Sequence, residues 1–206
     1  MVRKTKEETE NTKIQILQAA LDCFYEKGFS KTSFDDIAER IEMTKGAVYW
    51  HFKDKAELLI ALMKNHLRQK YEDGVNRELP ETVDGLYRFF KNESEYIETH
   101  PNLRKFIFFV MMQVEWSDAI FNKVIAELGE IRNFHMTTVS NALTLAQKKG
   151  EIPPLANINE AAWLIVNSWR GALNFYVTEP DTEFSLTKDF MYGLDIILNW
   201  LRKEGK

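Results

Sequence analysis

The residues with the most distinctive chemistry lie between Ser33 and Lys55, in the stretch SFDDIAERIEMTKGAVYWHFKDK. Thr44 and Lys45 supply a hydroxyl and an ammonium group, and both can donate hydrogen bonds to base edges in the major groove of DNA. Gly46 follows without a side chain, so the backbone there can approach a ligand closely. These residue types, in this order, indicate a surface that reads double-stranded DNA.

Polar and cationic groups farther along the same stretch suit the phosphate backbone. Tyr49 and His51 can donate to phosphate oxygens, and Lys53 and Lys55 add point charges. Aromatic residues at helical spacing also commonly pack in a core. We expect core packing of Phe52 and of the Trp that follows Tyr49, and the alternatives of a packed Tyr49 and a merely solvated His51 stay open.

Two short helices joined by a turn would position these groups. The apolar pattern predicts helices over 34–41 and 44–52, with Thr44 capping the second and Ser33-x-x-Asp36 forming a capping box before the first. A preceding helix over 12–27 would end at Gly28. In a helix-turn-helix of this kind, the first turn of the second helix reaches the bases and flanking groups contact phosphates.

The rest of the chain also predicts helices and no strands. Proline, glycine and short polar clusters separate the apolar patterns, and Gly129 can bend the longest one. The fold class is therefore all-α, with about nine helices and a three-helix head on a larger helical body. The later helices are expected at about 54–78, 81–99, 102–116, 119–149, 159–178 and 187–203.

Composition sets limits on the kind of protein. The 206 residues carry a net charge of −4, but the first 70 hold 13 Lys and Arg against 11 Asp and Glu, while the remainder hold 14 against 20. A basic excess in the N-terminal third fits a DNA-reading head on an acidic body. Cys23 is the one cysteine, so no disulfide can form within the chain. Without a signal peptide or a membrane-spanning run, we expect a cytoplasmic protein that does not enter a membrane.

The stretch GFSKTSFDDIAERIEMTKGAVYWHFKDKAELL closely resembles the N-terminal domain of TetR-family (tetracycline-repressor-like) transcriptional regulators. Its most diagnostic part is AVYWHFKDK, from Ala47 to Lys55, and the resemblance covers about 12–62. Trp50 beside Tyr49 looks like the branch that represses multidrug efflux pumps. The later helices match this family only in number and length.

The resemblance implies a ligand-responsive DNA-binding regulator with a head over 1–54 and an effector-binding and dimerisation domain over 55–206. It implies a dimeric repressor that a small lipophilic effector releases from operator DNA, with an efflux pump as a possible target of control. It requires no cofactor. The DNA contacts that it implies are Thr32, Ser33, Thr44, Lys45, Gly46, Tyr49, His51 and Lys55.

A homodimer is expected because one head reads few base pairs. The last two helices mix small and large apolar residues, which allows close packing between subunits. The same faces could instead close the core of the monomer, and the two uses are compatible. The residues expected in the dimer interface are Trp169, Leu173, Tyr176, Leu194, Ile197, Leu198 and Leu201.

The middle helices are rich in Phe, Met and Trp, with polar groups inside the apolar runs. Most of the aromatic residues are ordinary core, but a few polar groups that converge on an aromatic cavity make a small-molecule site. An acid such as Glu115 would favour a cationic, planar effector. The residues expected in the ligand pocket are Phe89, Phe109, Met112, Gln113, Glu115, Trp116, Asn133, Asn167, Arg170 and Asn174.

Two other classes of protein fit the sequence less well. An enzyme lacks support, because the four histidines fall on separate predicted elements without the spacing of a metal site or a catalytic triad, and no phosphate-binding glycine loop is present. A helical adaptor or small-molecule-binding protein without sequence-specific DNA binding would leave the surface at Thr44 to Gly46 without a purpose.

Overall fold

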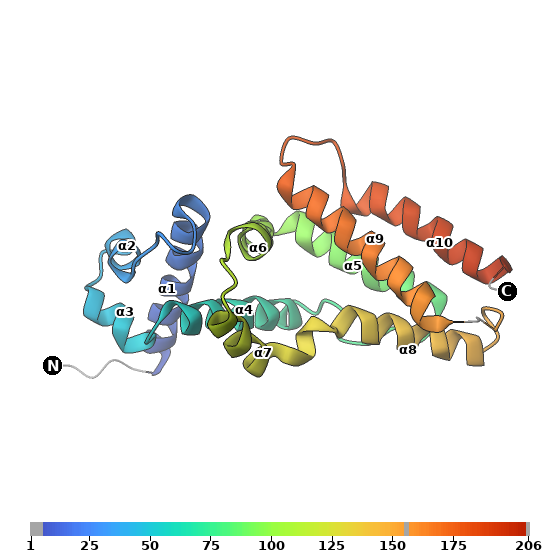
Figure 1. Ribbon diagram of the computed structural model, residues 1–206, viewed down its shortest axis with the longest axis horizontal. Coiled ribbons are helices and arrows are strands. Elements are labelled where there is room, and N and C mark those ends of the chain that lie inside the picture. Colours follow the sequence, from blue (N-terminus) through green and yellow to red (C-terminus); the bar gives the residue numbers. More distant parts are fainter. Residues whose placement is uncertain (1–5, 155–156, 205–206) are drawn as a thin grey trace. The chain divides into compact units, whose positions relative to one another are not determined.

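The computed structural model describes residues 6–154 and 157–204, and over these ranges the chain is helical and contains no strand. The predicted all-α class is confirmed (Figure 1). The first helices are α1 (Lys6–Lys27), α2 (Phe34–Arg40), α3 (Lys45–His51), α4 (Lys55–Glu72), α5 (Val83–Thr99) and α6 (Pro101–Phe108). The π-helical segment η1 (Phe109–Gln113) continues α6. It is followed by α7 (Asp118–Arg132), α8 (Phe134–Lys148), α9 (Ile158–Thr178), the π-helical segment η2 (Leu186–Phe190) and α10 (Met191–Glu204).

The chain divides into two compact units. The first comprises Met1–Gln69 and Lys105–Leu128, and the second comprises Lys70–Arg104 and Gly129–Lys206. Most of α4 therefore belongs to the first unit, while its last residues belong to the second. The boundary predicted between 54 and 55 lies inside the first unit, which we call the head unit; we call the second the body unit.

The head unit is built around the apolar face of α1. Phe24 is fully buried and stacks on Phe109 of η1, with ring centroids 5.0 Å apart and planes 8° apart. Gly28 then ends α1 with φ +85°, as the sequence predicts, because this left-handed conformation is strained for residues that carry a Cβ. Cys23 is buried in the same core.

Side-chain caps fix where α2 and α3 begin. The Ser33 hydroxyl accepts a hydrogen bond from the Asp36 N–H, and the Asp36 carboxylate accepts one from the Ser33 N–H at 2.7 Å, so the predicted capping box is confirmed. Thr44 caps α3 by accepting from the Ala47 N–H at 3.2 Å. Glu42 has φ 53° in the turn between the two helices. These local bonds fix the residues at which the two helices begin.

The body unit packs α5, α8, α9, η2 and α10 around aromatic residues. The Trp169 ring lies 5.5 Å from Phe90 of α5 and 4.9 Å from Phe190 of η2. The helix expected over 119–149 is divided in the structure, because α7 is kinked at Leu128, next to Gly129, and α8 starts anew after Asn133. In the described part of the chain, no helix is long and apolar enough to cross a membrane.

Candidate nucleic-acid interface and helical body

The first turn of α3 presents the groups that the sequence singles out. The hydroxyl of Thr44 is used as a cap but stays at the surface, and Lys45 and Gly46 are exposed beside it. A Cβ built on Gly46 would meet only the Thr44 hydroxyl, at 3.9 Å. The backbone at Gly46 is therefore open to a close approach from outside.

Lys45 has a partner in the preceding helix. Its Nζ lies 2.6 Å from Oδ2 of Asp35 on α2, and both side chains are more than half exposed. The hydrogen bond with Asp35 raises the pKa of Lys45 above its ordinary value. The ammonium also lies 5.9 Å from the centroid of the Tyr49 ring, so it is held over the exposed face of α3.

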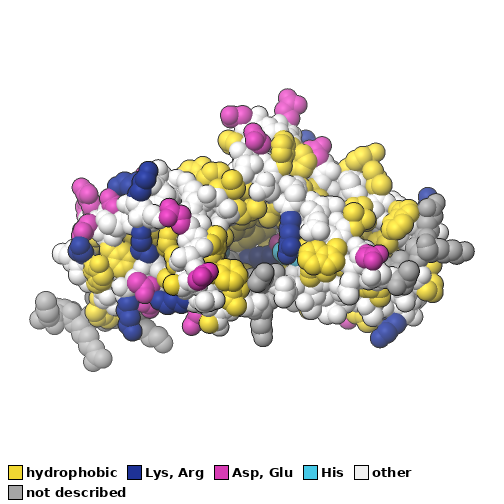
Figure 2. Space-filling view, in the orientation of Figure 1, with side chains coloured by type: hydrophobic (Ala, Val, Ile, Leu, Met, Phe, Trp, Pro, Cys, Tyr) yellow, Lys and Arg dark blue, Asp and Glu magenta, His cyan; other side chains and the backbone are white. Residues whose placement is uncertain are grey.

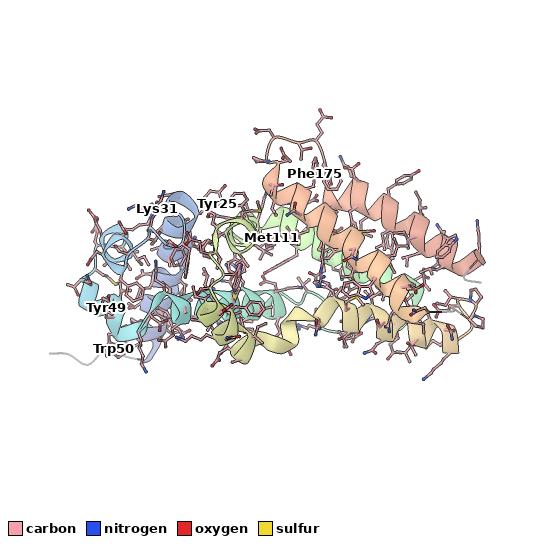
Figure 3. The ribbon with its side chains drawn as sticks, in the orientation of Figure 1. Tyr25, Lys31, Tyr49, Trp50, Met111 and Phe175 are labelled. Atoms are coloured by element: carbon pink, nitrogen blue, oxygen red, sulfur yellow. The ribbon has the colours of Figure 1, made fainter. Side chains whose placement is uncertain are left out.

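The aromatic residues of α3 divide between core and surface. Phe52 is 1% exposed, which confirms its expected core position, whereas Tyr49 is 50% exposed and rests its ring on Phe34 at 4.8 Å. Trp50 is 71% exposed, so the expectation that it packs in the core is wrong. Figure 3 shows Tyr49 and Trp50 pointing outward from α3. The fully buried Val48 takes the core position, and Trp50 is a surface residue that sequence reasoning missed.

The end of α3 borders a groove of about 590 Å³ within the head unit. His51 lines this groove, half-buried, with its ring 4.6 Å from that of Trp50. Lys53 lies on the rim, and its backbone N–H donates to Glu57 at 2.8 Å. Asp54 accepts a hydrogen bond from the Glu57 N–H at 2.7 Å, which caps the start of α4. Cationic groups thus accompany His51 where α4 begins.

Thr32 and Lys55 are turned into the protein rather than away from it. The Thr32 side chain is buried, and its hydroxyl donates to the carbonyls of Gly28 at 2.8 Å and Cys23 at 3.1 Å. Lys55 donates to the carbonyls of Phe29 at 2.8 Å and Ser30 at 3.0 Å, and burial lowers the pKa of its ammonium. Both side chains brace the loop between α1 and α2, so their predicted role as free phosphate contacts does not match this geometry.

The residues expected at a dimer interface lie mostly inside the body unit. Trp169, Leu194, Leu198 and Leu201 are each at most 2% exposed, while the remaining three are half-buried. These four side chains close the core of their own unit, so they are not available to a second subunit. Helical periodicity predicted that these residues lie on an apolar face of α9 or α10. It could not predict which of the apolar faces of these helices points into the core.

A different apolar surface remains on α9 and α10. Tyr192, Ile196 and Trp200 recur every four residues along α10, and they are 72%, 54% and 46% exposed. Hydrophobic side chains are visible over this part of the molecule in Figure 2, and Figure 3 shows Phe175 on α9. We call this surface the α9–α10 face; its large exposed residues are Trp163, Leu164, Phe175, Tyr192, Ile196 and Trp200.

The residues expected in a ligand pocket have several different environments. Phe109 and Phe89 are buried in the cores of the head unit and the body unit, respectively. Four polar residues of the body unit are exposed: Asn133, Asn167, Arg170 and Asn174. In the head unit, Met112, Glu115 and Trp116 are exposed, and the half-buried Gln113 donates from Nε2 to the Tyr25 carbonyl at 3.0 Å. Within the two units, these residues therefore lie partly in the cores and partly at the surface.

Among the described residues, several buried polar atoms have no hydrogen-bond partner. In the head unit these are Oε1 of Gln113 and Nε2 of His66, whose ring stacks on Phe106 at 4.3 Å. Burial lowers the pKa of His66 to about 4. In the body unit, Nε2 of His135 is buried near the rings of Phe89 and Phe90, and burial lowers its pKa too. Unpartnered buried polar atoms are costly, so these atoms indicate places where a ligand could form a hydrogen bond, as a donor to the Gln113 oxygen or as either partner of an imidazole nitrogen.

Residues 16–62 match the model of the family described as bacterial regulatory proteins, tetR family. The whole chain resembles the HTH-type transcriptional regulator TtgR of Pseudomonas putida, with 30% identity over 98% of this chain and 97% of TtgR. The chain belongs to the TetR family, as its sequence motif indicated.

Two further relatives agree with this assignment. The HTH-type transcriptional regulator AcrR of Shigella flexneri is 50% identical over 58 residues, which are 28% of this chain and 27% of AcrR. The solved structure of SmeT, the repressor of the Stenotrophomonas maltophilia multidrug efflux pump SmeDEF, is 28% identical, with a TM-score of 0.71 over 96% of this chain and 93% of SmeT. A complex of SmeT with triclosan is also known, with 27% identity and a TM-score of 0.75 over 95% and 93% of the two chains.

Proposed function

We propose that this protein is a cytoplasmic, dimeric repressor that binds operator DNA through α3 and is released by a small lipophilic effector. The observation that carries the proposal is the exposed face of α3, where Lys45, Gly46, Tyr49 and Trp50 are all at the surface of a helix whose other face is fixed by the buried Val48. A helix presented in this way fits the major groove. The role is that of a regulator and not of an enzyme.

Each group on this face has a distinct part in DNA binding. Thr44 and Lys45 donate to base edges, and Gly46 allows the close approach. Tyr49 and His51 donate to phosphates on either side, which fixes the register of the helix. Trp50 adds an apolar surface suited to a thymine methyl group or a sugar. The side chain of Ser33 is engaged in its cap, so Ser33 contributes through the N-terminal end of α2.

Dimerisation uses the α9–α10 face. Large apolar side chains that are about half exposed or more, arranged on two adjacent helices, are typical of a surface that another chain covers. Two copies of this face would form a four-helix interface with two-fold symmetry. The two heads could then bind half-sites about 34 Å apart, one turn of DNA.

Effector binding acts on DNA affinity through a population shift. The continuous helix α4 supports this link, because it begins next to the end of α3 and its Lys70 pairs with the buried Glu93 in the body unit. We propose that the effector is a lipophilic molecule with a polar group that pairs with an unpartnered buried atom of one unit, either Gln113 or His66 in the head unit or His135 in the body unit, and a protonated amine would suit the Gln113 oxygen. By analogy with SmeT, we propose that the repressed genes encode a multidrug efflux pump.

DNA binding is tested by selection from a random double-stranded library, followed by fluorescence anisotropy with the recovered DNA at several salt concentrations. We expect one preferred, two-fold symmetric sequence, with affinity that falls steeply as salt rises. Binding without any sequence preference would refute the proposal and favour a helical adaptor protein.

Effector binding is tested separately, by titrating the protein–DNA complex with triclosan and with the cationic dye ethidium. Because ethidium also binds DNA, thermal melting of the DNA-free protein is measured in parallel. Release of DNA together with a raised melting temperature supports an effector site. If neither compound changes the melting temperature, the proposed effector classes are wrong.

A further inference from the structure

An acidic side chain lies on the face of the helix-turn-helix that we propose to bind DNA. Asp35, in the first turn of α2, holds the Lys45 ammonium at 2.6 Å, and its side chain is 61% exposed. Figure 1 shows α2 and α3, which carry these two residues, next to each other in the head unit. The position is unexpected because a carboxylate repels the phosphates that dominate DNA affinity.

The cap of α2 does not require Asp35. The carboxylate that caps α2 belongs to Asp36, which accepts from the Ser33 N–H and pairs with Lys27 at 2.6 Å. An exposed ion pair such as Asp35–Lys45 contributes little to stability, because water screens both charges and two flexible side chains must be ordered. Asp35 also lies in the first turn of α2, where a carboxylate interacts favourably with the helix N-terminus, but that interaction does not require the contact with Lys45, and raw DNA affinity disfavours an acid at this position.

We infer that Asp35 is a specificity-determining residue, which selects operator DNA by holding the Lys45 ammonium on the reading face and by opposing binding to phosphates alone. This inference rests on the proposed DNA-binding function. The lysine side chain is flexible and carries a point charge. Without a partner, its ammonium would pair with the nearest phosphate, whatever the DNA sequence. When a carboxylate holds the ammonium in place, its remaining N–H groups can donate only to acceptors that lie next to that fixed position.

The chemistry of the pair indicates which base pair it would read. The ammonium can donate to O6 and N7 of guanine, and a carboxylate can accept from the N4 amino group of cytosine. The Asp35–Lys45 pair therefore matches the donor and acceptor pattern of a G·C pair. A thymine O4 facing the carboxylate would be repelled.

The test compares sequence selection by the wild type, Asp35→Asn and Lys45→Met, all as full-length protein on the same random library. We expect both variants to lose preference at the same G·C position and to keep it elsewhere. If the sequence selected by Asp35→Asn matches that of the wild type at every position, the inference is overturned. If the wild type selects no sequence at all, the proposed function itself has failed, and the two failures are thereby distinguished.

A second measurement separates specificity from simple charge. Asp118→Asn removes the same charge from an exposed site on α7 of the head unit and serves as the matched control. With Asp35→Asn, we expect affinity for unrelated DNA to rise on the order of threefold per head while affinity for the selected DNA is unchanged or lower. An equal rise for both DNAs, of the size seen with Asp118→Asn, would mean that Asp35 acts only through net charge, and the inference would be wrong.

Discussion

The buried imidazole of His66 should make the free energy of unfolding depend on pH. Its ring lies on α4 and stacks on Phe106 of α6 at 4.3 Å, with planes 28° apart. Nε2 is buried and has no partner in the described part of the protein, so a positive charge on this ring would lose its hydration without compensation. Burial accordingly lowers the pKa of His66 from 6.5 to about 4 in the folded state.

The sign and size of the effect follow from proton linkage. Above about pH 6.5 the imidazole is neutral in both states, so its contribution to folding is fully present. As the pH falls below 6.5, His66 becomes protonated in the unfolded chain, whereas in the folded protein it stays neutral until the pH nears 4. The folded state should therefore lose up to about 2 kcal/mol of stability between about pH 7.5 and pH 5. The ring is only partly shielded, so solvent screening places the expected loss between about 1 and 2 kcal/mol.

The assay is urea denaturation of the wild type and His66→Phe across this pH range at one fixed protein concentration. Phenylalanine keeps a ring to stack on Phe106 but cannot take up a proton. The stability difference between the two proteins should shift by about 1 to 2 kcal/mol in favour of the variant as the pH falls from about 7.5 to about 5. The contribution of His135 is common to both proteins and cancels. Parallel pH profiles would refute the reasoning, because they would mean that His66 titrates alike in both states.

Three further predictions follow from particular contacts. Replacing Trp200 of the α9–α10 face with Arg should leave the monomer folded, shift the sedimentation profile toward monomers and weaken DNA binding at least tenfold. The reason is that covering a half-exposed tryptophan is worth about 3 kcal/mol per subunit. An unchanged dimer would mean that this face is not the dimer interface. Lys55→Met should lower the free energy of unfolding by about 1 to 3 kcal/mol in urea, because two carbonyls lose a charged donor, and no change would mean that Lys55 is no brace. Thr32→Val should destabilise the protein by about 1 to 3 kcal/mol without altering the selected DNA sequence; a changed sequence would place Thr32 at the interface.

Much of the fold was predictable because local chemistry determines it. The caps at Ser33 and Thr44, the left-handed end at Gly28 and the absence of alternating patterns led directly to the short helices and the all-α class. The division near Asn133 was not predictable, because the apolar pattern runs through it and the residues there do not forbid a helix. Residue type alone also misplaced Trp50, since a large aromatic side chain at helical spacing suits a core and a DNA-facing surface equally well.

The candidate site was predictable in its location and less so in its details. The sequence placed Lys45 and Gly46 at the surface, but it could not show that Lys45 pairs with Asp35 from another helix, because that contact depends on the angle between α2 and α3. It likewise could not show that Lys55 turns back to the carbonyls of Phe29 and Ser30. On α9 and α10 the apolar residues cover more than one face, and only packing decides which of them stays outside.

The most direct test of the central claim, that the exposed face of α3 binds DNA, removes one hydroxyl group from that face. Tyr49→Phe is compared with Tyr71→Phe, which makes the same change at a 67% exposed tyrosine on α4. With the selected DNA, Tyr49→Phe should lose affinity on the order of tenfold while keeping the same sequence preference, because a phosphate contact positions the helix without reading bases. Tyr71→Phe should bind like the wild type. Equal affinities for the wild type and both variants would contradict the claim that α3 contacts the DNA backbone through Tyr49.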